Sequence, residues 1–129
     1  ETAKLYKIEQ VAFDPWNASH LTTQLNDEDG IPMDKQRQGF YSMSAPSKLF
    51  ERMVLDRKLA YNRNPLLDWQ VDHLACERDK KDNVIPDKAT STARIDGIVA
   101  CIMAIGRAVA HGEKRASVYT RKGPLVLEL

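Results

Sequence analysis

The stretch IDGIVACIMAIGRAV, residues 95–109, contains the longest apolar run of the chain. Its isoleucine, valine and methionine side chains cover most of the circumference of a helix, and such a helix is buried between other elements. Gly97 and Gly106 would let neighbouring elements approach it closely. Ser91 or Thr92 precedes it as a candidate N-cap. The pattern therefore predicts a central helix around which the rest of the chain packs.

Working towards the N-terminus, the patterns alternate between strand and helix. Residues 5–13 (LYKIEQVAF) become continuously apolar at their end, which is typical of a strand entering a covered sheet. The Asp14-Pro15 pair ends this strand. A helix is predicted over residues 17–29, and a short second strand over residues 31–37.

The middle of the chain predicts two further helices. After a loop at residues 39–43, Ser44 is a candidate N-cap with Pro46 in the first turn, and an amphipathic helix follows to about Arg57. The Asn64-Pro65 pair has the same cap-and-first-turn pattern and opens the next helix.

A hairpin and a basic tail complete the expected order. Residues 74–78 and 83–86 flank the polar turn DKKDN, which predicts two antiparallel strands. The tail, residues 113–129, is rich in lysine and arginine and ends in PLVLEL, which favours an extended segment. The sequence thus predicts a mixed α/β domain over residues 1–112, followed by this tail.

Composition narrows the functional classes. The chain has 129 residues, is 43% hydrophobic and 29% charged, and carries a formal charge of +1. These values exclude a disordered tail, a collagen and a disulfide scaffold, and they leave DNA binding to local patches. The longest apolar stretch, residues 98–105, is far shorter than the ~20 residues of a membrane span. Cys76 and Cys101 form no zinc-binding pattern and favour a reducing compartment.

Two acids stand out by their positions. Asp14 follows a predicted strand, where ligands of α/β sheets bind, and Asp96 enters the apolar helix, where a bare carboxylate is costly. Carboxylate oxygens are ligands of Mg²⁺, and two ions ~4 Å apart activate water in phosphodiester cleavage. The alternatives are structural. An Asp-Pro pair initiates turns, and an Asp in the first turn of a helix gains ~0.3–1 kcal/mol from the helix dipole.

Several basic or polar residues are candidates for phosphate contact. Lys35, Arg37 and Gln38 lie in one short charged segment, and Lys88 and Arg94 precede the central helix. Solvated surface charge is the alternative for each of them. The chain has no phosphate-binding loop, no dinucleotide-binding glycine pattern and no nucleophile elbow.

Taken together and in order, five motifs resemble the C-terminal nuclease domain of tailed-phage terminase large subunits, which are DNA-packaging motor proteins. The fourth motif is the strongest match, with its Lys, Ser-Thr, Ile-Asp-Gly and apolar helix. The motifs are VAFDPWNA (residues 11–18), QGFYSMSAPSKLFERMVLDRKL (38–59), NPLLDW (64–69), IPDKATSTARIDGIVACIMAIGRA (85–108) and SVY (117–119).

The resemblance implies a ribonuclease H-like fold and a Mg²⁺- or Mn²⁺-dependent endonuclease acting on double-stranded DNA. It also implies that Asp14 and Asp96, which match the family's motifs, are catalytic metal ligands. The family's third acid lies on an earlier strand, and no residue before Asp14 fits it, so we expect an incomplete fold and weak activity of the chain alone. Two positions depart from the family, with Tyr61 in place of a frequent His and His73 in place of Asn.

The resemblance also implies partners and a place of action. They are double-stranded DNA, the terminase small subunit, the portal of the procapsid and the host cytoplasm, with no membrane. ATP would serve only the ATPase domain, which this sequence does not contain. Two alternatives stay open: a non-catalytic prophage remnant that binds DNA or a partner, and a recombinase or resolvase of the same fold.

Overall fold

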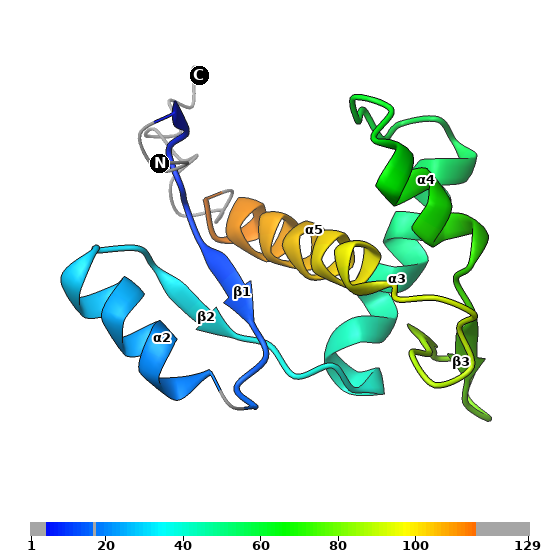
Figure 1. Ribbon diagram of the computed structural model, residues 1–129, viewed down its shortest axis with the longest axis horizontal. Coiled ribbons are helices and arrows are strands. Elements are labelled where there is room, and N and C mark those ends of the chain that lie inside the picture. Colours follow the sequence, from blue (N-terminus) through cyan, green and yellow to red (C-terminus); the bar gives the residue numbers. More distant parts are fainter. Residues whose placement is uncertain (1–4, 17, 116–129) are drawn as a thin grey trace, which may run out of the picture.

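The computed structural model describes residues 5–16 and 18–115 (Figure 1). It is a mixed α/β structure in which short strands alternate with helices. The elements in chain order are β1 (Val11–Phe13), α2 (Ser19–Thr23), the π-helical turn η1 (Gln24–Glu28), β2 (Met33–Lys35), α3 (Phe40–Leu55), α4 (Pro65–Asp72), β3 (Cys76–Arg78), β4 (Val84–Pro86) and α5 (Asp96–Arg115).

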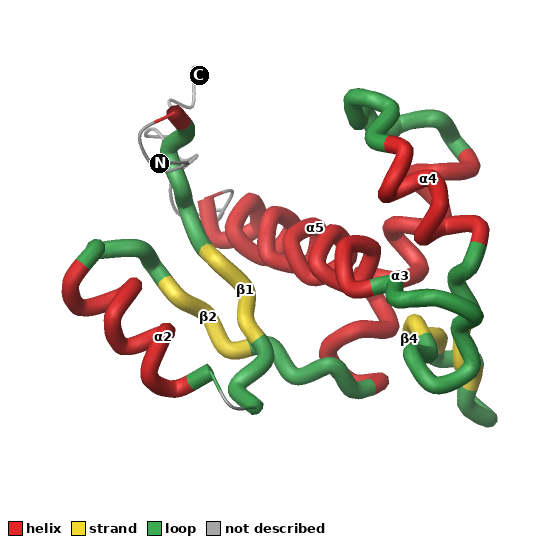
Figure 2. The backbone as a smooth tube through the Cα atoms, viewed as in Figure 1, coloured by secondary structure: helices red, strands yellow, loops and turns green. Residues whose placement is uncertain are grey.

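Helix α5 is the centre of the molecule, as its apolar circumference predicts. It lies between the β1–β2 pair on one side and α4 on the other (Figure 2), and it packs against α3. Ile95 and Ile102 are each 1% exposed and Ile98 is 2% exposed. Met43 and Phe50 of α3 complete the same apolar core.

The predicted N-cap of α5 is wrong, because Ser91 has other partners. Its hydroxyl accepts from the Ala75 N–H at 3.0 Å and donates to the Asp87 carbonyl, which fixes a loop before the helix. The helix begins at Asp96, and the carbonyl of Ile95 accepts the first intrahelical bond, from the Val99 N–H at 3.0 Å.

Strands β1 and β2 are parallel, with Val11 opposite Met33 and Phe13 opposite Lys35. The strand predicted over residues 5–13 is therefore shorter than expected. Its first part carries the exposed ion pair between Lys7 and Glu9 (2.7 Å) and has no partner strand among the described residues. The ladder is extended at its other end, where the Gln36 N–H donates to the Phe13 carbonyl at 2.8 Å.

The helix predicted over residues 17–29 is present as α2 and η1, and Asn17 itself lies outside the described residues. A positive φ of 65° at Gly30 ends this segment. Such a backbone conformation is open to glycine without steric cost. It turns the chain back so that β2 can run parallel to β1 (Figure 1).

Helix α3 begins at Phe40, so the predicted loop at residues 39–43 and the predicted cap at Ser44 are wrong. The Ser44 hydroxyl is buried and accepts from the Val84 N–H at 3.2 Å, which ties the helix to β4. Pro46 lies inside the helix, and its ring faces Gly106 of α5. A Cβ at Gly106 would lie 2.8 Å from Pro46 Cγ, so glycine is needed at this close approach.

Both remaining predictions of local structure are confirmed. Asn64 caps α4, because its Oδ1 accepts from the Leu66 N–H at 2.9 Å, and Pro65 is the first helical residue. Strands β3 and β4 form the antiparallel hairpin, with Arg78 opposite Val84.

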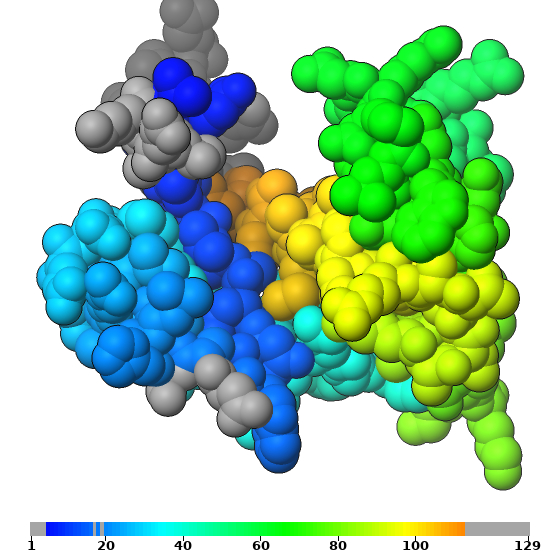
Figure 3. All heavy atoms as spheres, in the orientation of Figure 1, coloured from blue at the N-terminus to red at the C-terminus, as the bar shows by residue number. Residues whose placement is uncertain are grey.

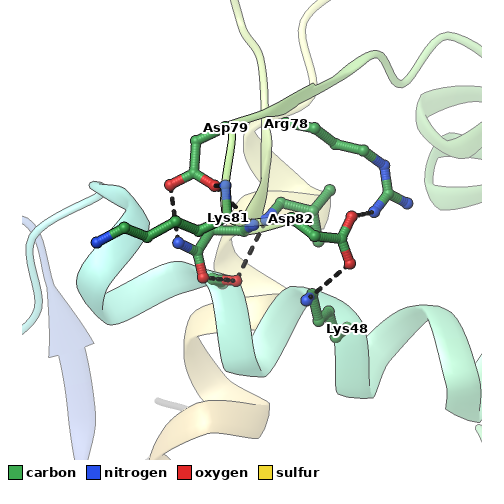
Figure 4. Close-up of polar contacts among 8 residues, drawn as sticks. Lys48, Arg78, Asp79, Lys81 and Asp82 are labelled. Carbon is green, nitrogen blue, oxygen red and sulfur yellow. Dashed lines mark hydrogen bonds and ion pairs between the residues drawn. The ribbon is translucent and has the colours of Figure 1, made fainter.

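The hairpin turn is held by two aspartates (Figure 4). The Asn83 side-chain amide donates to Asp79 Oδ2 at 2.7 Å, and the N–H groups of Asn83 (2.9 Å) and Lys81 (2.8 Å) donate to Asp79 Oδ1. These bonds, the Asn83 side-chain bond first, lower the pKa of Asp79. Asp82 binds Arg78 at 2.8 Å and Lys48 of α3 at 3.3 Å. The turn is therefore fixed both internally and against α3.

In the space-filling view, the blue and cyan atoms of the β1–α2 part and the green atoms of α4 stand on either side of α5 (Figure 3). The sheets described are two pairs of short strands. No helix within residues 5–16 and 18–115 is long and apolar enough to cross a membrane. The motif SVY and the expected extended segment PLVLEL lie outside the described residues.

Candidate functional site

Asp14 lies directly after β1, at the carboxyl end of the strand, as predicted. Its Oδ1 accepts from the Trp16 N–H at 3.1 Å, so the residue also has the turn-forming role that its proline neighbour suggests. The side chain is partly buried, whereas Trp16 is 81% exposed. The strand end thus presents one carboxylate beside a tight turn.

Asp96 is the first residue of α5 and lies at the surface. Its side chain is 66% exposed, although its neighbours Ile95 and Ile98 are buried. The expected burial of this carboxylate is therefore wrong, because the first turn of α5 points this position outward. A hydrogen bond from Lys88, together with the Lys88 charge and a smaller contribution from Arg94, lowers the pKa of Asp96. The carboxylate therefore stays ionised to a lower pH than an isolated aspartate.

The hydrogen-bonded turn at residues 87–90 places Lys88 beside Asp96. The Asp87 carboxylate accepts from the Thr90 hydroxyl at 2.7 Å and from the Ala89 N–H at 2.8 Å, and these bonds, the Thr90 bond first, lower the pKa of Asp87. Lys88 follows Asp87 in this turn, and its Nζ lies 2.8 Å from Asp96 Oδ1. Two of the predicted residues are thus brought together as an ion pair.

Sequence reasoning missed Gln70, which fixes the first turn of α5. This side chain of α4 is 7% exposed, and its Oε1 accepts from the Ile98 N–H at 3.0 Å. A Cβ at Gly97 would lie 2.7 Å from that oxygen, so the glycine next to Asp96 makes room for the bond. The available signal was a lone amide on α4, and only the contact between α4 and α5 shows that it is buried.

The remaining candidates lie between β2 and α3. Lys35 and Arg37 are exposed, and neither side chain has an ion-pair or hydrogen-bond partner among the residues that the structure describes. Gln38 instead turns towards α5, where its Nε2 lies 3.8 Å from Met103 Sδ. Since Gln36 pairs with Phe13, this segment leaves the sheet at the same edge as Asp14.

The described part of the chain, residues 5–16 and 18–115, holds no group of three histidine, cysteine, aspartate or glutamate side chains that could bind a metal ion. Asp14 and Asp96 remain the candidate ligands. Their oxygens suit a hard divalent cation in chemistry.

A family model described as "Terminase large subunit, endonuclease domain" matches residues 2–112. The chain belongs to this terminase endonuclease family. The crystal structure of the HK97 bacteriophage large terminase matches this terminase chain with a TM-score of 0.72 and 26% identity, over 82% of this chain and 23% of that chain. The resemblance predicted from the five motifs is thereby confirmed.

Two curated relatives match the chain, and one of them is a terminase large subunit. Protein YmfN of Escherichia coli (strain K12) is 31% identical over 110 residues, which is 84% of this terminase chain and 24% of YmfN. The terminase large subunit of Enterobacteria phage HK97 is 29% identical over 112 residues, which is 84% of this chain and 21% of that protein. The chain therefore spans about a quarter or less of the relatives that it matches.

Proposed function

We propose that this chain forms part of a divalent-metal-dependent endonuclease site on a ribonuclease H-like fold, which cuts concatemeric double-stranded DNA during genome packaging. The observation that carries the proposal is the position of Asp96. It is an exposed, ionised carboxylate on the first residue of a buried helix, in a chain of the terminase endonuclease family.

In this proposal Asp14 and Asp96 hold Mg²⁺ or Mn²⁺ from a strand end and a helix start. Bound ions would lower the pKa of an attacking water and stabilise the leaving oxygen of the phosphodiester. The chain's own contributions are rigid placement and charge. Gln70 holds the turn that carries Asp96, and Lys88 lowers the pKa of that carboxyl group.

DNA is held by local cations in this proposal, because the formal charge of the whole chain is only +1. The contacts come from Lys35 and Arg37 and, near the metal ligands, from Arg94. Lys88 would contact DNA only in exchange for its ion pair with Asp96. Gln38 contacts Met103, so its part is to support the segment that bears Lys35 and Arg37. Phosphate contacts release counterions, and binding should therefore weaken steeply with salt.

The wider assignments follow from the family. The domain is residues 1–112 with a basic tail at residues 113–129, although α5 itself continues to Arg115. The partners would be the terminase small subunit and the procapsid portal, in the host cytoplasm. ATP would be used by another domain of the motor.

A site-specific measurement of Mn²⁺ binding tests the proposal. Paramagnetic Mn²⁺ should broaden the NMR signals of residues next to Asp14 and Asp96, with weak affinity, because two carboxylates bind a divalent ion poorly. Asp14→Asn and Asp96→Asn should each remove the broadening while the rest of the spectrum is unchanged. Broadening that persists in both variants would place the metal elsewhere.

The second candidate is a non-catalytic member that binds DNA or a motor partner. It is favoured by the lack of any three-ligand group in the described residues. Conversion of supercoiled plasmid to nicked and linear forms by a longer protein that restores the earlier strand and its acid, with a chelator as control, separates the two candidates. A recombinase or resolvase is less well supported, because the matching family model is that of terminases.

A further inference from the structure

A hollow of about 560 Å³ lies between the connection from β2 to α3 and the middle of α5. We call it the β2–α3 hollow. Neither the family match nor the metal site assigns it a role. The residues used below are among those that line it: Lys35, Gln36, Arg37, Phe40, Tyr41 and Arg107.

The charge in the β2–α3 hollow is positive. Lys35 and Arg37 have no partner among the described residues, so both charges are available to a ligand. Arg107 is already committed, because its guanidinium pairs with Asp34 and donates to Gln10 Oε1 at 2.8 Å. The positive charges of Lys35 and Arg37 are therefore not paired with any acidic side chain among the described residues.

The start of α3 adds unpaired N–H groups to the same hollow. The N–H groups of Ser42 and Met43 donate to the Gly39 carbonyl at 3.2 and 3.0 Å, and Gly39 supplies no side-chain cap. The preceding N–H groups, of Phe40 and Tyr41, have no acceptor among the residues that the structure describes. An uncapped start of a 16-residue helix favours an anion.

Gln36 supplies a buried, incompletely paired carboxamide at the same place. It lines the β2–α3 hollow, is only 8% exposed, and its Oε1 is buried without a hydrogen-bond partner. Its Nε2 has only the weak acceptor Met43 Sδ, at 3.5 Å. Buried carboxamides are normally paired. If a half-turn exchanges the oxygen and the nitrogen of this one, the unpaired atom becomes an N–H donor, which is what an anion requires.

The location connects the hollow to the proposed active site. The Gln36 N–H donates to the Phe13 carbonyl at 2.8 Å, and Asp14 is the next residue after Phe13. Asp14 and Arg37 therefore leave the sheet at the same edge, at the carboxyl ends of two parallel strands. Ligands of parallel sheets bind at such an edge.

We propose that the β2–α3 hollow binds one backbone phosphate of duplex DNA and so fixes the duplex relative to Asp14. The phosphate oxygens accept from the Phe40 and Tyr41 N–H groups and lie between the Lys35 and Arg37 side chains. This inference rests on the proposed function in one respect, which is that DNA is the ligand.

The test is an NMR titration of the whole chain, first with inorganic phosphate and then with a short DNA duplex. Both ligands should shift the Phe40 and Tyr41 amides and the Gln36 side-chain NH₂. If only phosphate shifts them, the hollow is an anion site that does not hold DNA, and the proposal is overturned. Shifts confined to other residues overturn it as well.

Paired variants separate this site from general surface charge. Lys35→Ala with Arg37→Ala should abolish the phosphate shifts and reduce the slope of log affinity against log salt for DNA by about 1.8, since each contact contributes ~0.9. Lys80→Ala with Lys81→Ala removes the same charge from the exposed hairpin turn and should leave the phosphate shifts intact. Equal loss in both pairs would contradict a specific site.

Two variants at Gly39 keep the fold and differ from each other only in charge. A Cβ there meets nothing within 4 Å and the φ is −102°, so Gly39→Asp and Gly39→Asn both fit as helix caps. The affinity for phosphate should be at least tenfold lower in the Gly39→Asp variant than in the Gly39→Asn variant. Equal affinities would overturn the proposal. Absence of plasmid cleavage by a longer protein that restores the third acid, with intact phosphate shifts, would instead refute the nuclease function and leave the β2–α3 hollow standing.

Discussion

The contact between Gln70 and Gly97 predicts that Gly97→Ala has opposite effects on stability in two backgrounds. It should destabilise the native chain and stabilise a chain in which Gln70 is replaced by alanine. In the native protein, Gly97→Ala places a methyl group 2.7 Å from Gln70 Oε1 and 3.2 Å from Leu67 Cδ2. Overpacking of this kind costs ~1–3 kcal/mol, which exceeds the ~0.5–1 kcal/mol that alanine gains over glycine within a helix. Gly97→Ala should therefore destabilise the native chain.

The same substitution should be stabilising once Gln70 is shortened. Gln70→Ala alone costs ~1–3 kcal/mol, because the buried Ile98 N–H loses its acceptor. It also removes the oxygen that the new methyl group would meet, so that only the movable Leu67 side chain remains close. In this background Gly97→Ala should add up to ~1 kcal/mol of stability.

Urea denaturation of the four proteins measures this double-mutant cycle. The expected coupling between the two sites is at least ~1 kcal/mol, well above the ~0.3–0.5 kcal/mol within which independent sites add. If Gly97→Ala has the same effect in both backgrounds, Gln70 does not press on the first turn of α5, and its role in placing Asp96 is refuted.

Two further predictions follow from the core and from the ion pair. Ile102→Ala should cost ~2–5 kcal/mol by denaturation, because Ile102 is 1% exposed, whereas Val109→Ala on the same helix should cost far less, because Val109 is 43% exposed; equal effects would mean that α5 is peripheral. Lys88→Gln should raise the pKa of Asp96, measured by NMR of its carboxyl carbon. Because Lys88 lowers that pKa in the folded state, the ion pair stabilises the fold at pH values above the ordinary pKa of aspartate. This stabilisation is lost as the pH falls through the lowered pKa of the folded state. A pH profile of stability that is the same in native chain and variant would contradict this.

The sequence predicts elements well where local chemistry alone decides them. The apolar circumference of α5 requires that this helix be buried. The Asn64-Pro65 pair caps α4 through a hydrogen bond within three residues. The same rules fail at Ser44 and Ser91. Their hydroxyls bind the N–H groups of Val84 and Ala75, and no local pattern reveals partners so distant in the chain.

The candidate site divides along the same line. Asp14 and Asp96 can be chosen from the ends of their elements and from family motifs. Gln70 cannot, because its burial depends on how α4 meets α5. The Lys88–Asp96 ion pair depends on the Asp87 turn, whose geometry comes from bonds that are only visible in the structure.

The most direct test of the account is the separation of the Asp14 and Asp96 carboxylates in a crystal structure determined with Mn²⁺. We predict that the two carboxylates lie about 4–7 Å apart with Mn²⁺ bound at them, as the ~4 Å spacing of two-metal sites requires. A well-ordered structure in which they lie more than about 12 Å apart, or in which Mn²⁺ binds other residues, would contradict the assignment of Asp14 and Asp96 as the metal ligands.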